Sequence, residues 1–262
     1  MRKKSIKFLS LALMSCLLLT ACGNSSAGKD EKTYAVEAGS AGETAAKEKG
    51  FQYNAVSSQA DALMEVASGT SDAAIIDLLM AGAMIGEGTS YPDMEYTDKL
   101  TTEEYGVGCR KDSDLASFIN EVFAETYADG SMRETAEKYG VQESLVEQPE
   151  TTYEASSDSD VEKIKEKGTL IVGITDFAPM DYKDDSGEWI GFDADMARIV
   201  AEKLGVEAQF VEIDWDNKIM ELESGNIDVV WNGMTLTDEV TSAMACTNAY
   251  CNNAQVVVVP TK

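Results

Sequence analysis

Two similar stretches of the chain end in groups with opposite hydrogen-bonding character. The first, MEVASGTSDAAIID, ends at Asp77, and the second, MELESGNIDVVWNG, ends at Asn232 and Gly233. Each reads as a helix that stops at glycine and is followed by a buried strand. A carboxylate that ends a buried strand is costly unless it is paired. The repeat therefore predicts that Asp77 and Asn232-Gly233 lie at equivalent strand ends; for Asp77, a helix cap or an ion pair between lobes is the alternative to contact with a ligand.

Residue types that serve common catalysis are scarce. Histidine is absent from the sequence, which removes the commonest general base and metal ligand. No Ser or Cys nucleophile stands beside a base, so covalent catalysis is not indicated. The acidic stretch DYKDDSGEW lacks the spacing of an EF-hand loop and is typical of a solvated hairpin turn. We predict no enzyme activity, no metal and no cofactor.

Composition indicates a globular, acidic protein. The chain has 262 residues, of which 44% are hydrophobic, and a formal net charge of −26. This length suffices for a core in two lobes, and the negative charge argues against nucleic acid as a partner. Cys109, Cys246 and Cys251 are expected to be small buried residues, and a disulfide between Cys246 and Cys251 is left open.

The N-terminal segment has the pattern of an export signal. Basic residues precede an apolar run from Phe8 to Ala21 that is too short to span a bilayer. Its end, LTAC, resembles the lipobox of bacterial lipoproteins, which implies cleavage before Cys22 and a lipid on that cysteine; ordinary secretion with a free Cys22 is the alternative. We expect a signal peptide over 1–21, a tether over 22–32, and a cell-membrane location with the protein facing the extracellular or periplasmic side.

The rest of the chain alternates between predicted strands and helices, which indicates an α/β class with mainly parallel sheets. Strands are expected at TYAVEAG, FQYNAV and DAAIID in the first half and at TLIVGIT, VEAQFVEI and IDVVWNG in the second. We expect one lobe over 33–106, a return segment over 107–148, an acidic solvated linker over 149–160, and another lobe over 161–262. Ligands bind outside the carboxyl ends of strands in such sheets, so the two ends of the repeat should line one cleft.

Longer motifs resemble the family of extracellular solute-binding proteins of ABC transporters for polar amino acids. The matching text includes GTLIVGITDFAPMDY, GEWIGFDADMARIVAEKLG and IDWDNKIMELESGNIDVVWNGMTLTDE in one half, and YAVEAGSAGET and EEYGVGCRKDSDL in the other. The resemblance covers nearly the whole chain after the signal. It implies a two-lobed, periplasmic-binding-protein-like type II fold (Venus flytrap).

The order of the two halves differs from that of the family, in which the lobe that starts GTLIVG comes first. This indicates a circular permutation, with the acidic linker joining the usual ends. One covalent hinge strand is then expected between the lobes in place of two. A rearranged gene is the alternative explanation.

The resemblance also implies the ligand contacts. Asp77 matches the position that holds an α-ammonium group, and Phe177 and Trp215 match aromatic positions that sandwich the ligand. Gly233 and Thr235 match positions whose backbone amide and hydroxyl meet a carboxylate. Ser40 and Ala41 open a helix whose free N–H groups attract an anion.

One position departs from the family pattern. Val240 stands where the resemblance predicts an arginine that grips the ligand carboxylate. The carboxylate is then held by amides, Thr235 and Lys218, or the ligand is not a plain α-amino acid. Glu37 and Asp176 would make the cleft acidic and favour a cationic or amine-rich solute.

The predicted function is a lipid-anchored, monomeric receptor that binds an amino acid or similar small polar amine between two lobes. The resemblance implies delivery of this solute to an ABC permease. An enzyme on the same scaffold, similar to a cyclic-acid dehydratase, and a ligand sensor are the alternatives.

Overall fold

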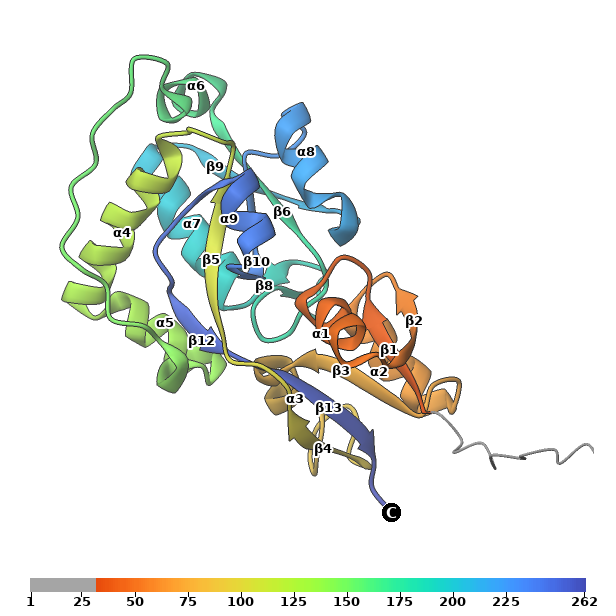
Figure 1. Cartoon of the computed structure of the whole chain (residues 1–262). Helices are drawn as coiled ribbons and strands as arrows, with labels where there is room; N and C mark the ends of the chain where they lie inside the picture. Colours follow the sequence, from red (N-terminus) through yellow and green to blue (C-terminus); the bar gives the residue numbers. More distant parts are fainter. Residues whose placement is uncertain (1–31) are drawn as a thin grey trace, which may run out of the picture. The chain divides into compact units, whose positions relative to one another are not determined.

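Two β-sheets organise the described part of the chain, residues 32–262 of a computed structural model (Figure 1). These residues form one compact unit. The predictions for the signal peptide, Cys22 and residues 22–31 of the tether lie outside the described residues. Each sheet is flanked by helices, which confirms the predicted α/β class with two lobes.

The smaller lobe contains a sheet with the strand order β2-β1-β3-β13-β4. β1, β2 and β3 are parallel, whereas β13 runs antiparallel to β3 and β4. The strand β13 comes from the far end of the chain and lies beside β3 and β4 in Figure 1. The elements of the smaller lobe are β1 (Thr33–Glu37), α1 (Ala41–Lys49), β2 (Gln52–Val56), α2 (Gln59–Ser68), β3 (Ala73–Asp77), α3 (Leu78–Met84), β4 (Met94–Lys99) and β13 (Gln255–Pro260).

The larger lobe contains a sheet with the order β11-β5-β10-β6-β9, and β12 also pairs with β5. β6 is parallel to β9 and β10, and β5 is antiparallel to β10. Its elements are β5 (Glu103–Cys109), α4 (Leu115–Asp129), α5 (Ser131–Tyr139), η1 (Gln142–Ser144), α6 (Asp160–Lys167), β6 (Thr169–Ile174), β7 (Tyr182–Lys183), β8 (Trp189–Ile190), α7 (Phe192–Leu204), β9 (Glu207–Glu212), η2 (Trp215–Asn217), α8 (Lys218–Ser224), β10 (Val229–Thr235), α9 (Asp238–Ala243), β11 (Ala245–Cys246) and β12 (Cys251–Asn253).

Local signals in the sequence account for the repeated helix–strand unit. Helix α2 begins after Ser58, whose hydroxyl accepts a hydrogen bond from Asp61 N at 3.1 Å. It ends at Gly69, whose φ of 73° is the left-handed conformation that glycine adopts without strain. Ala62, Leu63 and Val66 of α2 are buried in the core, and the next strand, β3, is buried along its whole length. The helix, its glycine stop and the buried strand were all predicted by the sequence pattern.

The chain crosses between the two sheets twice, not once. The first crossing joins β4 to β5 and the second joins β12 to β13. Leu100 N donates to Gln255 O at 2.8 Å, and Gln255 N donates to Thr101 Oγ1 at 2.8 Å, so the crossings lie side by side. The prediction of a single hinge strand is therefore wrong, because the second crossing is completed before the chain reaches Lys262.

The predicted lobe boundaries need two corrections for the same reason. Residues 255–260 were assigned to the lobe over 161–262, but β13 pairs with β3 and β4 of the smaller lobe. Residues 103–106 were assigned to the lobe over 33–106, but they begin β5, which pairs with β10 and β12 of the larger lobe. Each crossing is one nearly continuous extended segment, so pattern alone does not show where it changes sheet.

The acidic linker is anchored at its middle. Tyr153 packs edge-on against Phe118 of α4, with ring centroids 5.3 Å apart, and its hydroxyl donates to Asp114 Oδ2 at 2.9 Å. Most of the other linker residues are exposed, as the composition predicted. Tyr153 thus fixes the linker to the larger lobe, a contact that the acidic composition did not predict.

The stretch DYKDDSGEW forms the predicted hairpin. β7 pairs antiparallel with β8, and Asp184 Oδ1 accepts hydrogen bonds from Ser186 N at 2.8 Å and Glu188 N at 3.0 Å. These backbone donors satisfy the acid within the turn itself.

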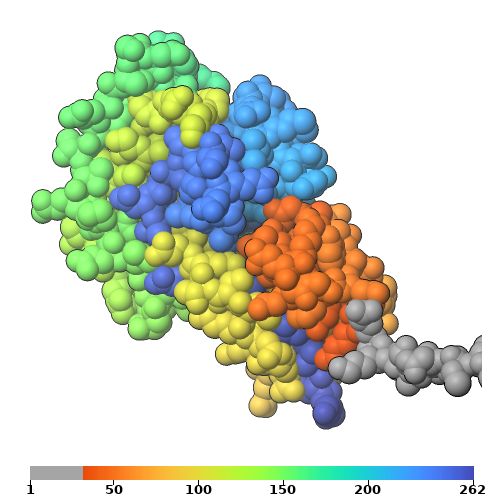
Figure 2. All heavy atoms as spheres, viewed as in Figure 1, coloured from red at the N-terminus to blue at the C-terminus, as the bar shows by residue number. Residues whose placement is uncertain are grey.

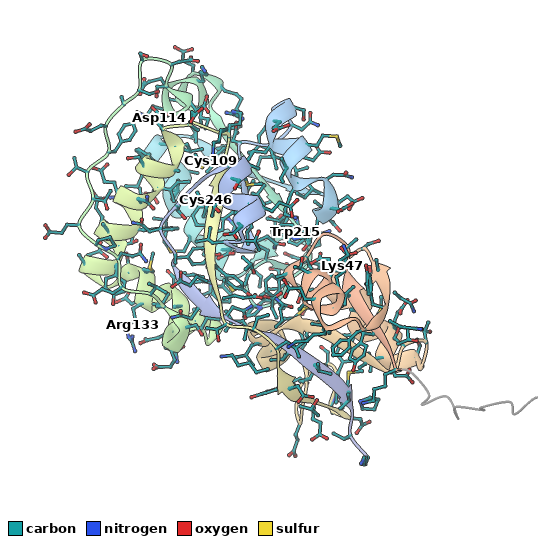
Figure 3. All side chains as sticks on the ribbon, in the orientation of Figure 1. Lys47, Cys109, Asp114, Arg133, Trp215 and Cys246 are labelled. Atoms are coloured by element: carbon teal, nitrogen blue, oxygen red, sulfur yellow. The ribbon has the colours of Figure 1, made fainter. Side chains whose placement is uncertain are left out.

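The three cysteines among residues 32–262 are free thiols. Cys109 and Cys251 are buried, as expected for small core residues, whereas Cys246 is half-buried. Cys109 and Cys246 lie on the neighbouring strands β5 and β11 (Figure 3). The disulfide between Cys246 and Cys251 that the sequence left open is not formed.

No helix within residues 32–262 combines the length and apolar character needed to cross a membrane.

Candidate functional site

A small cavity lies between the two lobes, where the ends of β1 and β3 face η2 and β10. It encloses about 40 Å³, room for only a few water molecules. A solute of amino-acid size therefore requires the lobes or their side chains to move. In Figure 2 the orange residues of the smaller lobe contact blue residues of the larger lobe on the visible face. Seven of the eight predicted ligand contacts line the cavity: Ser40, Ala41, Asp77, Phe177, Trp215, Gly233 and Thr235.

Asp176 is the predicted contact that the structure places elsewhere. Its neighbours Thr175 and Phe177 are buried, and because the chain is extended here, Asp176 points to the opposite side and is exposed. It lines a separate surface groove with Tyr182 and Lys183. The prediction that Asp176 makes the cleft acidic is therefore wrong.

Asp77 lies at the end of β3 and is held by donors from both lobes. Its carboxylate accepts hydrogen bonds from the Tyr105 hydroxyl at 2.5 Å, from Gln255 Nε2 at 3.0 Å, and from the side-chain amides of Gln59 and Asn253. Burial, and then the charge of Glu103, raise the pKa of Asp77 to about 7. Its carboxylate makes no cap bond to α3, so the helix-cap role is excluded. Asp77 is buried beside the hinge, where it binds residues of both lobes, and it also lines the cavity.

Glu37 ends β1 beside Asp77 and is 3% exposed. Its Oε1 has no hydrogen-bond partner among the described residues. Burial, followed by the charge of Asp77, raises the pKa of Glu37 to about 8, while Lys218 and Gln59 act in the opposite direction. Glu37 lines the cavity, and its unpartnered carboxylate oxygen retains the capacity to accept a hydrogen bond.

Lys218 is the cation of the cavity and connects the lobes. Its Nζ donates to the Gly39 carbonyl of the smaller lobe at 2.8 Å and to the Trp215 carbonyl at 3.2 Å. The same ammonium lies 5.0 Å from the centroid of the Trp215 ring. Burial lowers the pKa of Lys218, while Glu239 and Glu37 oppose this shift. Lys218 is thus a buried side chain that lines the cavity where the two lobes meet.

Both predicted aromatic residues line the cavity. Phe177 is 2% exposed and packs edge-on against Tyr105, with ring centroids 6.3 Å apart. Trp215 comes from η2 and lies near the α1 helix that carries Lys47 (Figure 3). Two aromatic walls suit the apolar part of a small polar molecule.

The predicted donors on β10 are already used within the protein. Gly233 N donates to Asp193 Oδ2 at 2.7 Å, so this amide points into the larger lobe. Asn232 accepts from Thr175 and donates to Asp181 Oδ2 at 2.8 Å. The expectation that the Gly233 amide and Asn232 serve a ligand carboxylate is wrong, because buried Asp181 and Asp193 behind the strand bind these groups.

Thr235 is also engaged, in this case with the hinge. Its hydroxyl donates to Glu103 Oε2 at 3.1 Å, and the same oxygen accepts from Gln255 Nε2 at 3.0 Å. Thr235 lines the cavity, but its donor is directed to a carboxylate of the protein.

The start of α1 forms one wall of the cavity, as the sequence predicted. Ser40 caps the helix, and its Oγ accepts from Glu43 N at 3.1 Å. Glu43 Oε2 in turn accepts from Gly39 N at 2.8 Å. A carboxylate of the protein therefore already interacts with this helix end, which leaves less positive potential for an anionic ligand.

Val240 lies in α9 at the cavity wall and is 4% exposed. It packs in an apolar cluster with Trp215, Met234 and Met244. The three arginines among residues 32–262 pair with acids elsewhere: Arg110 with Asp160 and Asp228, Arg133 with Glu137 and Glu143, and Arg198 with Asp195. No arginine among the described residues lines the cavity in place of the one that the resemblance predicts at position 240.

The sequence reasoning missed four polar residues of the cavity: Thr44, Gln59, Thr237 and Glu239. Gln59 makes two hydrogen bonds with Asp77: its side chain donates to the Asp77 carboxylate and accepts from Asp77 N at 2.8 Å. It is the first residue of α2, directly after the cap Ser58, and nothing in the helix pattern marked its side chain as facing the cavity.

Comparisons with known proteins match one part of the chain most clearly. The family described as bacterial extracellular solute-binding proteins, family 3, matches residues 170–262. The L-cystine-binding protein TcyJ of Escherichia coli K12 is 41% identical over 78 residues, which are 29% of this chain and 29% of that protein. The cyclohexadienyl dehydratase of Pseudomonas aeruginosa is 32% identical over 85 residues, 32% of each chain. The chain thus spans about a third of the length of these curated relatives.

Among solved structures, the chain is similar to the arginine-bound form of domain 1 from TmArgBP, with 30% identity and a TM-score of 0.30. The match covers 37% of this chain and 84% of that domain. The matched part of the chain, residues 170–262, is thus similar to family 3 of the bacterial extracellular solute-binding proteins.

Proposed function

We propose that the protein is a lipid-anchored receptor that binds a small polar solute bearing an amine between its lobes and delivers it to an ABC permease. The observation that carries this proposal is the cavity between the lobes, which joins acidic side chains of the smaller lobe to aromatic and threonine side chains of the larger lobe. The family and the amino-acid-binding relatives support the solute class. The anchor at Cys22, the extracellular or periplasmic location, the permease and the monomeric state remain parts of this proposal.

Binding is proposed to work by closure of the lobes. The two crossings at Leu100–Thr102 and Ala254 are narrow and lie side by side, which suits a hinge. A ligand that contacts both lobes stabilises the closed arrangement, because only that arrangement provides all contacts at once. Asp77, Phe177, Trp215 and the start of α1 at Ser40 and Ala41 are the proposed contacts.

Two other functions are kept as alternatives. A dehydratase-like activity is supported by one relative, the cyclohexadienyl dehydratase, and the carboxyl of Glu37, with its pKa near 8, suits a general acid. A sensor that signals in its closed form would use the same cleft. Recovery of an unchanged ligand separates the receptor from the enzyme.

We further propose that the two lobes are encoded in swapped order relative to the family. The support is that β13, at 255–260, fits between β3 and β4 of the sheet that begins at Thr33. A reordered variant, in which 161–262 precedes 33–148 with a short flexible linker, should fold and bind the same solute. Failure of this variant to fold, beside a folded parent, would count against the proposal.

A thermal-unfolding screen of the purified protein tests the receptor function. The panel contains the common amino acids, small amines, polyamines and small peptides. A ligand present at a hundred times its dissociation constant should add about 2.7 kcal/mol to the free energy of unfolding. A flat response to the whole panel would contradict the proposal.

A further inference from the structure

The charged groups around the cavity are unevenly distributed. Glu37, Asp77 and Glu239 line it, against Lys218 as the one cationic side chain among the described lining residues. Glu37 and Asp77 are both buried, while Glu239 is exposed at the edge. With all four groups ionised, the cavity carries an excess of negative charge.

The donors that β10 presents toward the cavity are engaged within the protein. The Gly233 amide binds Asp193, and the Thr235 hydroxyl binds Glu103. The helix end at Ser40 already faces the Glu43 carboxylate through Gly39 N. Lys218 directs its two hydrogen bonds to carbonyl oxygens, and Val240 provides no charge.

The acceptor side of the cavity is different. Asp77 Oδ1 accepts from three side chains, which exceeds its two lone pairs, whereas Oδ2 accepts from Gln59 alone. Glu37 Oε1 is buried and has no partner among the described residues. Gln59 interacts with both acids, so the two available carboxylate oxygens belong to one corner of the cavity.

We propose that the cavity selects a small amine or guanidine that carries no carboxylate, and that Glu37 receives its cation with Asp77 beside it. This rests on the proposed function and specifies its solute. A cation pairs with the unpartnered Glu37 oxygen and offsets the excess negative charge. An α-carboxylate, in contrast, meets two buried acids, and the Gly233 amide and Thr235 hydroxyl on β10 are already bound to acids of the protein, so its desolvation is poorly compensated.

Matched pairs of ligands that differ only in the carboxylate test this selection. Calorimetric titration compares agmatine with arginine, cadaverine with lysine, and histamine with histidine. The decarboxylated member of at least one pair should bind about tenfold tighter or better, as expected for the difference between a compensated and an uncompensated buried charge. An amino acid that binds as tightly as its amine, or tighter, in every pair overturns the selection but leaves the receptor function standing. Binding of no compound overturns both.

Substitution of Glu37 tests the assigned acceptor. Glu37→Gln keeps the shape and the contact with Gln59 but removes the charge, and it should weaken the best amine by about 10- to 100-fold. The matched control is Glu104→Gln, which removes an exposed carboxylate on β5 outside the cavity and should change the affinity less than twofold. Equal affinities of Glu37→Gln and the parent protein, with both folded by circular dichroism, would overturn the role of Glu37.

Discussion

The Nζ atom of Lys218 lies 2.8 Å from the carbonyl oxygen of Gly39, and this hydrogen bond joins the two lobes at the mouth of the cavity. The backbones are close at the same point, because a Cβ on Gly39 would lie 2.7 Å from the Cα of Asp216. At this point the lobes are joined by one polar contact and by one close backbone approach that leaves no room for a side chain.

Replacement of Lys218 by methionine should shift the ligand-free protein toward a more open arrangement. Methionine keeps the packing on Trp215 but removes the ammonium, which costs about 1–3 kcal/mol of closed-state stability before relief of desolvation is counted. Small-angle X-ray scattering should show a larger radius of gyration. Lys183→Met is the matched control, since Lys183 also lies over a tryptophan, Trp189 at 4.5 Å, but does not bridge the lobes. Identical scattering of the two variants would show that the hydrogen bond from Lys218 to Gly39 does not hold the lobes together.

Asp77 should be essential for stability before it is tested for binding. Asp77→Ala removes an acceptor shared by four buried donor side chains, those of Gln59, Tyr105, Asn253 and Gln255, of which Asn253 and Gln255 keep a bond to Glu103. We expect a loss of about 3–5 kcal/mol in the free energy of unfolding, measured with urea. Asp98→Ala, on the exposed edge strand β4, should change it by less than about 0.5 kcal/mol. A small effect of Asp77→Ala would show that the hinge network contributes little.

Gly233 should tolerate no side chain. Its φ is +55°, and a Cβ would lie 2.3 Å from Phe177 Cε1. Gly233→Ala should cost about 3 kcal/mol or more, from backbone strain plus a clash with a buried ring. Gly225→Ala isolates the backbone part, because Gly225 has φ +76° with nothing within 4 Å, and should cost about 1–2 kcal/mol. Equal losses in the two variants would contradict the tight packing of Phe177 on Gly233.

Stability and amine binding should depend on pH in opposite directions. The pKa of Glu37 is raised to about 8 from an ordinary value of 4.5, so between these values the folded protein keeps a proton that the unfolded chain has lost. The free energy of unfolding without ligand should therefore fall as pH rises through this window. Urea titrations at pH 6 and pH 8.5 should show a smaller fall for Glu37→Gln, in which Asp77, with its pKa near 7, still contributes.

Binding of a cation requires ionised Glu37, so the affinity for an amine should rise over the same pH range. The charge of Lys218 lowers the pKa of Glu37, and the charge of Glu37 raises the pKa of Lys218, so Lys218 also contributes to this pH dependence. An amine affinity that falls from pH 6 to pH 8 would contradict the assignment of Glu37.

The sequence predicted the parts of this molecule that depend on local pattern. The helix of MEVASG, its glycine stop and the buried strand that ends at Asp77 follow from residue periodicity and capping. The position of Asp77 and Gly233 at one cavity followed from the rule that ligands meet the carboxyl ends of strands, whereas Trp215 was predicted from the family resemblance.

Features that depend on contacts distant in sequence were not predicted. The direction of the Gly233 amide is set by Asp193, forty residues earlier in the chain. The second hinge crossing depends on the pairing of β13 with β3, whose residues are about 180 positions apart. Asp176 was misplaced because the alternation of Thr175 and Phe177 toward the core decides its direction. The direction of a polar group and the sheet that a strand joins both depend on which distant part of the chain packs against that segment.

The most direct test of the receptor is calorimetric titration of the purified protein with the solute that gives the largest thermal shift, followed by chromatography of the solute released on denaturation. The account predicts one solute molecule per chain, recovered chemically unchanged. A converted product would favour the dehydratase-like alternative, and the absence of saturable binding to any amine or amino acid would contradict the account.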